Sequence, residues 1–208
     1  MGISERKERE KLEMRELILK AATAMFIEEG YEKTSLRNIA EKIEYSPATI
    51  YLYFKDKDEL FFAIHQLGFE KLLHKMMPVV AIENPLERLR ELGRIYIDFG
   101  LTHPEYYDLM FIMRAPINAL KEMNGDDGCW QDGDNTMKFL ESILQECIDK
   151  GLTRSTDKET LSMYTWATVH GMVSLHIRER YSILEIDEQE IKARMLATVD
   201  LMVENIKK

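Results

Sequence analysis

Apolar residues recur at three- and four-residue steps along most of the chain, which is the spacing of one face of an α-helix. The first such segment runs from about Arg6 to Glu29, and Gly30 follows it as a left-handed stop. Shorter helices are predicted over about Ser35–Ile43 and Ser46–Tyr53, and the second opens on a serine cap followed by proline. A longer helix is predicted from Asp58 to about Met76. No segment alternates as a strand does, so we expect an all-α fold.

Beyond Pro78 the amphipathic segments are longer, and prolines and glycines separate them. We predict further helices over about 85–103, 105–113, 135–150, 157–180 and 187–207. The stretch from Asn124 to Asn135 is rich in Gly and Asp and is predicted to be a solvated loop, because it lacks the ligand spacing of an EF-hand. The pattern therefore predicts about nine helices, divided into domains at 1–55 and 56–208.

Composition narrows the class of protein. Of the 208 residues, 45% are hydrophobic and 31% are charged, which suits a globular domain with a sizeable core. No apolar run approaches the roughly 18 residues that a membrane span needs. Cys129 and Cys147 cannot form a disulfide scaffold, and the charged N-terminus does not resemble a signal peptide. We therefore expect a cytoplasmic protein without a membrane partner.

The net charge of −9 alone would argue against a nucleic-acid partner. Its distribution changes that conclusion, because the window from Lys33 to Lys57 holds five cations and three acidic residues, a local charge of +2. The same window contains the second and third predicted helices with a tight turn between them. Such a pair is the skeleton of a helix-turn-helix, whose last helix enters the major groove of DNA.

The residue string from Thr34 to Leu60 gives this skeleton its specificity. It resembles the signature of the TetR family of bacterial transcriptional regulators. The preceding family pattern is matched, without a gap, by Ala21, Ala22, Phe26, Gly30, Tyr31, Thr34 and Ser35. The resemblance is dense over about residues 15–62. It implies a three-helix helix-turn-helix DNA-binding domain, followed by a larger helical domain for ligand binding and dimerisation.

The candidate DNA contacts lie in this string. Hydroxyls and amides at the start of the second helix can hold a phosphate, and small residues in the first turn of the third can approach base edges. Tyrosines and lysines further on are long enough to reach thymine methyls or phosphates. The predicted contacts are Thr34, Ser35, Arg37, Tyr45, Ser46, Pro47, Ala48, Thr49, Tyr51, Tyr53, Lys55 and Lys57. Taken singly, each also suits an ordinary solvated surface.

Two positions depart from the family pattern, in which glycine is expected in the turn and again early in the third helix. Glu44 and Ala48 stand there instead. A left-handed Glu44 would carry strain on the order of 1 kcal/mol, and its carboxylate would lie near DNA. These departures bear on base preference and leave the fold unchanged.

For the remaining two-thirds, the resemblance implies a body that dimerises and, in most members, binds a small molecule. Trp166, His170 and Gly171 resemble a Trp-His-Gly string of some regulatory domains, and the first two are four residues apart on one helix face. Methionines and aromatics suit an adaptable apolar pocket, although they suit ordinary core filling as well. The candidate ligand-binding residues are Tyr96, Phe99, Met110, Met113, Trp166 and His170.

A homodimer is expected because one short recognition helix reads few bases, and two copies would read a palindromic double-stranded operator. The last two long helices supply the candidate interface, whose residues are Leu161, Tyr164, Ala167, Thr168, Gly171, Leu175, Met195, Val199 and Met202. The expected function is a repressor released by an unknown apolar or amphipathic effector. A DNA-binding dimer controlled by a protein partner, without a small-molecule ligand, is the alternative.

The alternative from a different functional class is an enzyme or carrier built on a helical bundle. A di-iron site needs Glu-x-x-His pairs on facing helices, and the sequence contains none. Phosphate-binding glycine loops, HExxH zinc motifs and G-x-S-x-G elbows are equally missing from the sequence. We therefore expect no catalytic residues, no metal site and no cofactor.

Overall fold

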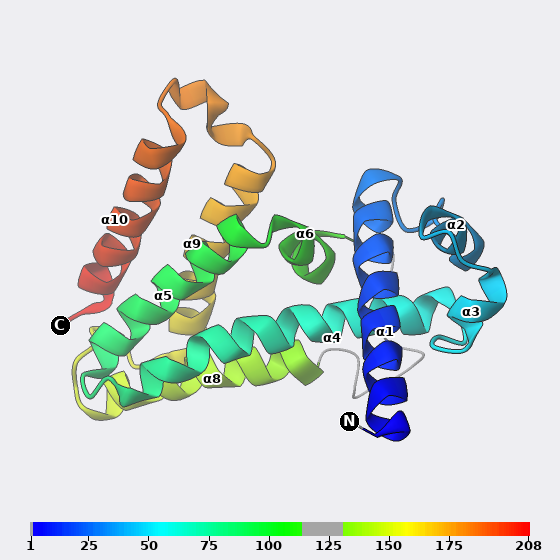
Figure 1. Ribbon diagram of the computed structural model, residues 1–208. Helices are drawn as coiled ribbons and strands as arrows, with labels where there is room; N and C mark the ends of the chain where they lie inside the picture. The colour runs from blue at the N-terminus through cyan, green and yellow to red at the C-terminus, as the bar shows by residue number, and fades with distance from the viewer. Residues whose placement is uncertain (1, 114–130) are drawn as a thin grey trace. The chain divides into compact units, whose positions relative to one another are not determined.

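The computed structural model describes residues 2–113 and 131–208, and the elements in these ranges are all helical (Figure 1). The first four are α1 (Ile3–Glu28), α2 (Leu36–Lys42), α3 (Pro47–Tyr51) and α4 (Lys57–Met76). The later elements are the 3₁₀ helix η1 (Met77–Ala81), α5 (Pro85–Thr102), α6 (Pro104–Tyr107), the π-helical η2 (Asp108–Ile112), α8 (Gln131–Asp149), α9 (Lys158–Ile177), the 3₁₀ helix η3 (Arg180–Leu184) and α10 (Glu188–Ile206). None of the helices in the described ranges is long and apolar enough to cross a bilayer.

The predicted helix starts and stops are set by local chemistry. Gly30 ends α1 with a φ of 87°, a left-handed conformation that glycine adopts without steric cost. Ser35 and Ser46 cap α2 and α3, because each side chain accepts a hydrogen bond from a backbone N–H three residues further on. Asp157 and Asp187 do the same for α9 and α10. The all-α expectation is confirmed.

The start of α8 corrects one expectation. Residues 131–135 were expected to close a loop, whereas α8 begins at Gln131. Acidic residues favour a helix N-terminus, and Asp134 forms an ion pair with Lys138 one turn further on. The rest of the expected loop, residues 124–130, lies outside the described residues, as does Trp130.

The chain divides into two compact units. One contains α1 to α3, the first part of α4 up to Gly68, and the segment that starts at Glu105. The other contains Phe69–Pro104 and Gln131–Lys208. Helix α4 is continuous and contributes residues to both units. The domain boundary near residue 55 stays a prediction.

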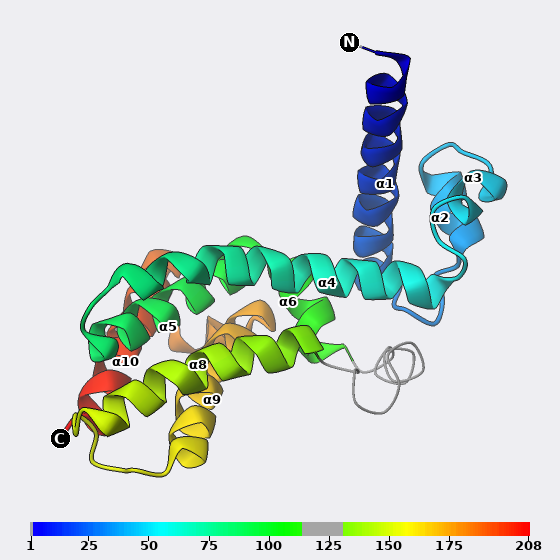
Figure 2. The same cartoon turned by 90° about the horizontal axis from the view of Figure 1, so that it is seen from below.

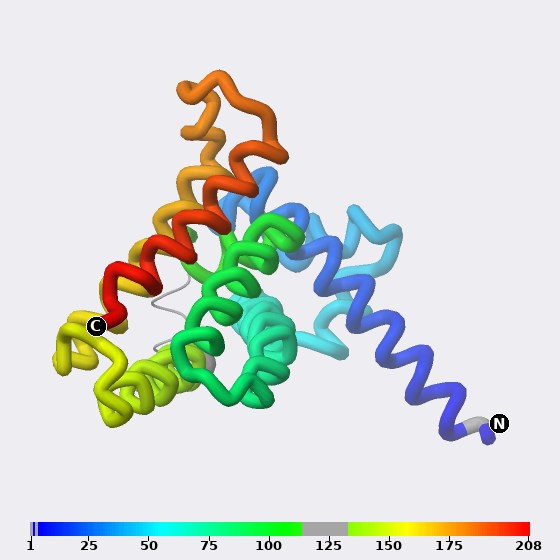
Figure 3. The backbone as a smooth tube through the Cα atoms, turned by 90° about the vertical axis from the view of Figure 1, so that its left-hand side faces the viewer, coloured from blue at the N-terminus to red at the C-terminus, as the bar shows by residue number. Residues whose placement is uncertain are grey.

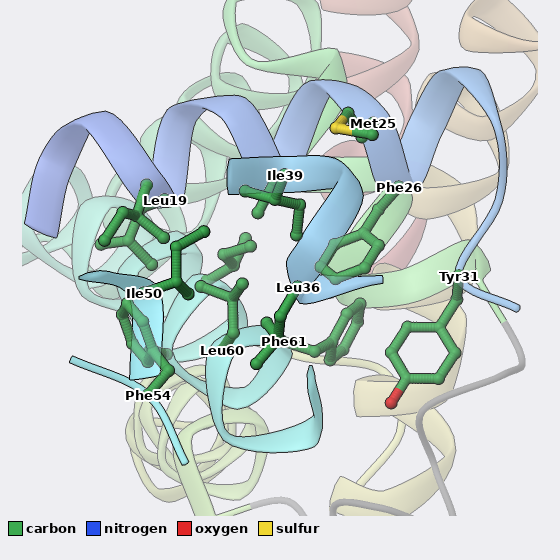
Figure 4. Close-up of a cluster of buried hydrophobic side chains, with 14 of the residues drawn as sticks. Leu19, Met25, Phe26, Tyr31, Leu36, Ile39, Ile50, Phe54, Leu60 and Phe61 are labelled. Atoms are coloured by element: carbon green, nitrogen blue, oxygen red, sulfur yellow. The ribbon is translucent and has the colours of Figure 1, made fainter. Parts of the chain in front are cut away.

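The first unit has an aromatic and aliphatic core that α1 to α4 share (Figure 4). The rings of Phe26, Tyr31 and Phe61 lie 5.4 to 5.6 Å apart, at angles typical of favourable aromatic pairs. Ile50 of α3 is fully buried in the same cluster. Leu109, from the later segment, completes it. This core fixes α2 and α3 against α1.

The second unit is built from α5, α8, α9 and α10, and α9 with α10 forms an antiparallel hairpin (Figure 3). Helices α5 and α10 approach closely at Gly93, where an added Cβ would lie 2.9 Å from Val199 Cγ1. Arg90 then ties the two helices together through ion pairs with Asp200 and Glu204, at 2.9 and 3.1 Å. The hairpin is therefore fixed to α5 by both packing and charge.

Candidate nucleic-acid interface

The turn between α2 and α3 has the hydrogen bonds of a Schellman motif. Tyr45 N–H donates to the Ala40 carbonyl at 2.9 Å, and Glu44 N–H donates to the Glu41 carbonyl at 3.2 Å. Glu44 is left-handed, with a φ of 61°, so the expected strain falls on a residue with a Cβ. The motif reverses the chain sharply and brings Ser46 to the start of α3.

The outer side of α3 exposes small and aromatic residues next to one another. Ala48 and Tyr45 are exposed, and the Tyr51 side chain is 58% exposed. Leu52 is 80% exposed and was missed by the sequence reasoning. An apolar side chain open to solvent beside a tyrosine suits contact with thymine methyl groups. The signal in the sequence was its position between Tyr51 and Tyr53, out of step with the buried Ile50 and Phe54.

The serine and threonine hydroxyls at the start of α3 are used in capping. Ser46 Oγ accepts the Thr49 N–H at 3.3 Å and lies 3.0 Å from Thr49 Oγ1. Pro47 fills the first turn, where its missing N–H costs nothing. Ser46 is exposed and Thr49 half-buried, so a capping hydroxyl and a phosphate or base can still share this end of the helix.

Three cations surround this surface, in different environments. Arg37 is exposed and pairs with Glu41 at 3.2 Å on the outside of α2. Lys55 is exposed, and its ammonium lies 3.8 Å from Asp56. Lys57 is half-buried. Its ammonium donates to the Tyr31 carbonyl at 2.8 Å and lies 4.1 Å from the centre of the Tyr31 ring. Arg37 and Lys55 are therefore the most accessible of the three to a phosphate.

Thr34 corrects the predicted contact set. Its side chain is only 1% exposed, and its hydroxyl donates to the Gly30 carbonyl at 2.9 Å. Its N–H donates to the same carbonyl at 3.3 Å, so neither group is presented to a phosphate. Thr34 instead holds the turn between α1 and α2. Ser35 is half-buried as the cap of α2, and Tyr53 is half-buried against the first unit's core.

In the second unit, three of the predicted ligand-binding residues lie together. The Trp166 indole N–H donates to the Tyr96 hydroxyl at 3.3 Å, and that hydroxyl lies 3.2 Å from His170 Nδ1. The rings of Trp166 and His170 are 5.5 Å apart. Burial lowers the pKa of His170, which favours the neutral imidazole. The cluster joins α5 to α9 through polar groups inside an apolar body.

The other predicted ligand-binding residues do not take part in this hydrogen-bonded cluster. Phe99 is fully buried in α5, and its ring lies 5.3 Å from that of His103. Met110 belongs to the first unit, where its sulfur lies 2.5 Å from the place a Cβ on Gly68 would take. Met113 packs against the core of the same unit. The polar trio thus forms one cluster within the second unit, and the two methionines belong to the first unit.

Burial corrects the predicted dimer interface in part. The side chains of four of the nine predicted residues are at most 5% exposed and pack inside the protomer, namely Leu161, Met195, Val199 and Met202. The other five are exposed or half-buried along α9, namely Tyr164, Ala167, Thr168, Gly171 and Leu175. The sequence reasoning missed the exposed Met163 and Leu201 on the same hairpin. The residues predicted on α10 lie on its inner face, because an apolar stripe in the sequence does not indicate which surface covers it.

The chain matches two family profiles. Residues 18–64 match "Bacterial regulatory proteins, tetR family", and residues 89–199 match "Tetracyclin repressor-like, C-terminal domain". The first match begins in the second half of α1 and ends in the first part of α4. The second runs from α5 into α10 and alone spans more than half of the chain.

Individual proteins agree with the profiles. The transcriptional regulator HbdR of Aromatoleum sp. is 24% identical over 180 residues, covering 85% of this chain and 77% of that protein. The fatty acid degradation regulator FadR from Bacillus halodurans superposes with a TM-score of 0.72 at 16% identity, over 91% of this chain and 94% of that one. The ketosteroid regulator KstR2 of Mycobacterium tuberculosis gives a TM-score of 0.73 at 18% identity, over 94% and 95%.

Proposed function

The chain belongs to the TetR family of bacterial transcriptional regulators, and from that premise we propose that it is a homodimeric repressor released from a palindromic operator by an apolar or amphipathic small molecule. It is a DNA-binding regulator, and it would work in the cytoplasm, where bacterial DNA lies. The exposed surface of α3 carries this proposal. This surface has the chemistry expected of a DNA recognition helix, because its apolar side chains are exposed to solvent instead of being buried.

The proposed contacts fall into two groups. Ala48, Tyr51 and Leu52 would face base edges in the major groove, since they are exposed and carry no charge. Arg37 and Lys55 would hold phosphates on either side, and the exposed Tyr45 would add a hydroxyl contact. Thr34 and Lys57 would act by positioning, because their polar groups hold the turn between α1 and α2.

The proposed dimer uses the exposed face of the hairpin of α9 and α10. Tyr164, Leu175 and Leu201 are at least 39% exposed there. Gly171 lies among them, and a Cβ at that position would meet no atom within 4 Å. A second copy placed against this face would cover large apolar side chains that the protomer leaves in water.

The proposed effector site lies at the trio of Tyr96, Trp166 and His170. Its three polar groups satisfy one another in a body of apolar helices, so a ligand can exchange hydrogen bonds with them while it buries apolar surface. One structural neighbour is a fatty acid degradation regulator and another is a ketosteroid transcriptional regulator. Fatty acids and ketosteroids are apolar or amphipathic compounds. This supports an effector of the same chemical kind.

Selection of bound sequences from random duplex DNA tests the DNA-binding proposal. We expect an enriched palindrome, since two copies read two half-sites. Arg37→Ala and Lys55→Ala should weaken binding to all sequences, and each should lower the salt dependence by about one counterion per protomer. Leu52→Ala should change the preferred bases instead, because it carries no charge. If no motif is enriched at low salt, the DNA-binding proposal is contradicted.

A charge placed in the proposed dimer face tests the assembly. Gly171→Glu should give a monomer by light scattering and abolish specific operator binding, while helical content is retained. Ser142→Glu is the matched control, because Ser142 is exposed on α8 and the variant adds the same charge. The proposed interface is wrong if wild-type protein is monomeric at micromolar concentration, or if both variants behave alike.

Tryptophan fluorescence tests the effector. In a Trp130→Phe background, Trp166 is the only tryptophan left. We expect fatty acids or steroids to quench it and to release operator DNA over the same concentration range. With Trp130 retained, Trp166→Phe should remove this quenching and leave binding to the operator intact. If compounds bind but never alter operator affinity, control by a protein partner takes the place of the small-molecule effector.

A further inference from the structure

The first turns of α1 do not contribute to the core of their own unit. Every described side chain from residue 4 to residue 13 is exposed, and the first buried residue of the helix is Ile18. These turns project beyond α2 and α3 as an uncovered helical arm (Figures 2 and 3). We define this arm as residues 4–16, in which Met14 and Arg15 are the residues that contact the rest of the unit. Isolated helical turns are marginal in water, so charge pairs along the arm matter to its helicity.

The charges of the arm are segregated between its two faces. One face carries three cations and one acidic residue, a net charge of +2, and consists of Lys7, Lys11, Arg15 and Glu8. The opposite face carries two cations and four acidic residues, a net charge of −2, and consists of Arg6, Arg9, Glu5, Glu10, Glu13 and Glu16. The protein as a whole has a charge of −9, so a basic face is not what average composition would produce.

The cations on the two faces differ in their partners. On the acidic face, Arg6 pairs with Glu10 at 2.7 Å and Arg9 pairs with Glu13 at 3.5 Å. Among the described residues, neither Lys7 nor Lys11 takes part in an ion pair within 4.0 Å. Intramolecular pairs thus account for the arginines, whereas the two lysines present their charge to solvent.

The basic face lies on the side of α1 that packs against the core and, at Arg15, against Phe54. Lys7, Lys11 and Arg15 follow one another at four-residue steps, and the same face continues as Ile18 and Ala22, which pack in the core. The Arg15 guanidinium carbon lies 5.4 Å from the centre of the Phe54 ring. Phe54 is directly followed by Lys55, the exposed cation beyond α3. Arg15 therefore lies next to the residue that precedes Lys55, and Lys11 and Lys7 follow it toward the N-terminus at steps of about one helical turn.

We propose that Lys7 and Lys11 bind the phosphates of duplex DNA just outside the half-site that α3 reads. This inference rests on the proposed operator binding and adds a contact to it. The arm rises about 1.5 Å per residue, so Lys7 lies about 12 Å along the helix axis from Arg15. Duplex DNA rises about 3.4 Å per base pair, so the arm extends the contact by about three to four base pairs on each side. A polyanion matches an extended row of cations, and duplex DNA is the polyanion that the same unit is proposed to bind.

The test compares a trimmed operator, which ends at the selected half-sites, with one extended by six base pairs at each end. Binding is titrated over a range of salt concentrations. For the wild type we expect a steeper salt dependence on the extended duplex. The Lys7→Ala/Lys11→Ala variant should lose about 1.8 from the slope per protomer on that duplex, since each phosphate contact contributes about 0.9. On the trimmed duplex it should match the wild type.

The matched control is Arg6→Ala/Arg9→Ala, which removes the same charge from the opposite face of the same turns. Its slope should equal the wild-type slope on both duplexes, with circular dichroism confirming that both variants remain helical. Equal slopes of the wild type on the two duplexes would overturn the arm contact while leaving operator binding intact. Equal losses in both double variants would do the same, since they indicate general attraction. Wild-type protein without specific binding to either duplex would contradict the proposed function itself.

Discussion

Substitutions at Glu44 should separate the effect of backbone strain on stability from the effect of its charge on DNA binding. Its φ of 61° is left-handed, and it occupies the position after the C-cap of α2 where helices most often carry glycine. Gly151 occupies the same position after α8, with a φ of 66° and the same pair of hydrogen bonds, from Gly151 N–H to Ile148 and from Leu152 N–H to Cys147. The chain therefore contains one motif twice, with glycine in only one copy. We expect Glu44→Gly to stabilise the protein.

The magnitude follows from two opposing terms. A left-handed residue with a Cβ costs about 1–2 kcal/mol, which the substitution removes. Glycine is more flexible in the unfolded chain, which returns about 0.4–1 kcal/mol. A net gain of about 0.5–1 kcal/mol remains, measured as a higher urea midpoint. Gly151→Ala should lose a similar amount, because a Cβ there meets nothing within 4 Å and only the conformation is penalised.

Glu44→Gln is the control for charge, since it keeps the strained conformation and removes the carboxylate. It should leave the urea midpoint unchanged and should tighten operator binding as Glu44→Gly does. A phosphate about 10 Å away in water repels one carboxylate by about 0.4 kcal/mol, so two copies in a dimer correspond to about fourfold in affinity. If Glu44→Gly is no more stable than Glu44→Gln, the strain argument is refuted.

Three further perturbations test the packing and protonation of the two units. Burial lowers the pKa of His65 from 6.5 to about 4. The stability that depends on a neutral His65 is therefore complete above pH 6.5 and is lost as the pH falls toward 4. In His65→Asn the urea midpoint should fall less over this pH range than in the wild type. Gly93→Ala should cost about 1–3 kcal/mol because its Cβ would press on Val199, and Val199→Ala should recover part of that loss. Tyr96→Phe should cost about 1–3 kcal/mol in thermal unfolding and change the tryptophan emission, since it removes the hydroxyl next to His170.

Much of the first unit was predictable because local chemistry decides it. Gly30, Ser35 and Ser46 set helix ends through φ and side-chain caps, and those interactions involve residues at most four positions apart. The left-handed conformation of Glu44 was considered because the family resemblance implies a glycine at that position in the turn, and its φ of 61° agrees. A sequence read locally gives such features because their partners are nearby in the chain.

The remaining features depend on partners far apart in the chain. Leu109 joins the core of the first unit although about 50 residues separate it from Leu60. Thr34 was assigned to DNA from its residue type, whereas its burial depends on how the turn after α1 packs. Val199 was assigned to the dimer because its stripe is apolar, and Gly93 of α5 is what covers it. Periodicity identifies a buried face but not the surface against which it is buried.

Helix α4 offers a route for regulation if the effector binds in the second unit. The helix is continuous from Lys57 to Met76 and belongs to both units. At its start, Lys57 is bonded to Tyr31 and Asp58 accepts the Tyr31 hydroxyl, so a movement of this end displaces the turn that leads into α2. A ligand acts through this route only by the difference between its affinities for the two states. A coupling of about 1–3 kcal/mol would change operator affinity by about 5- to 150-fold, and bound operator must weaken effector binding by the same factor.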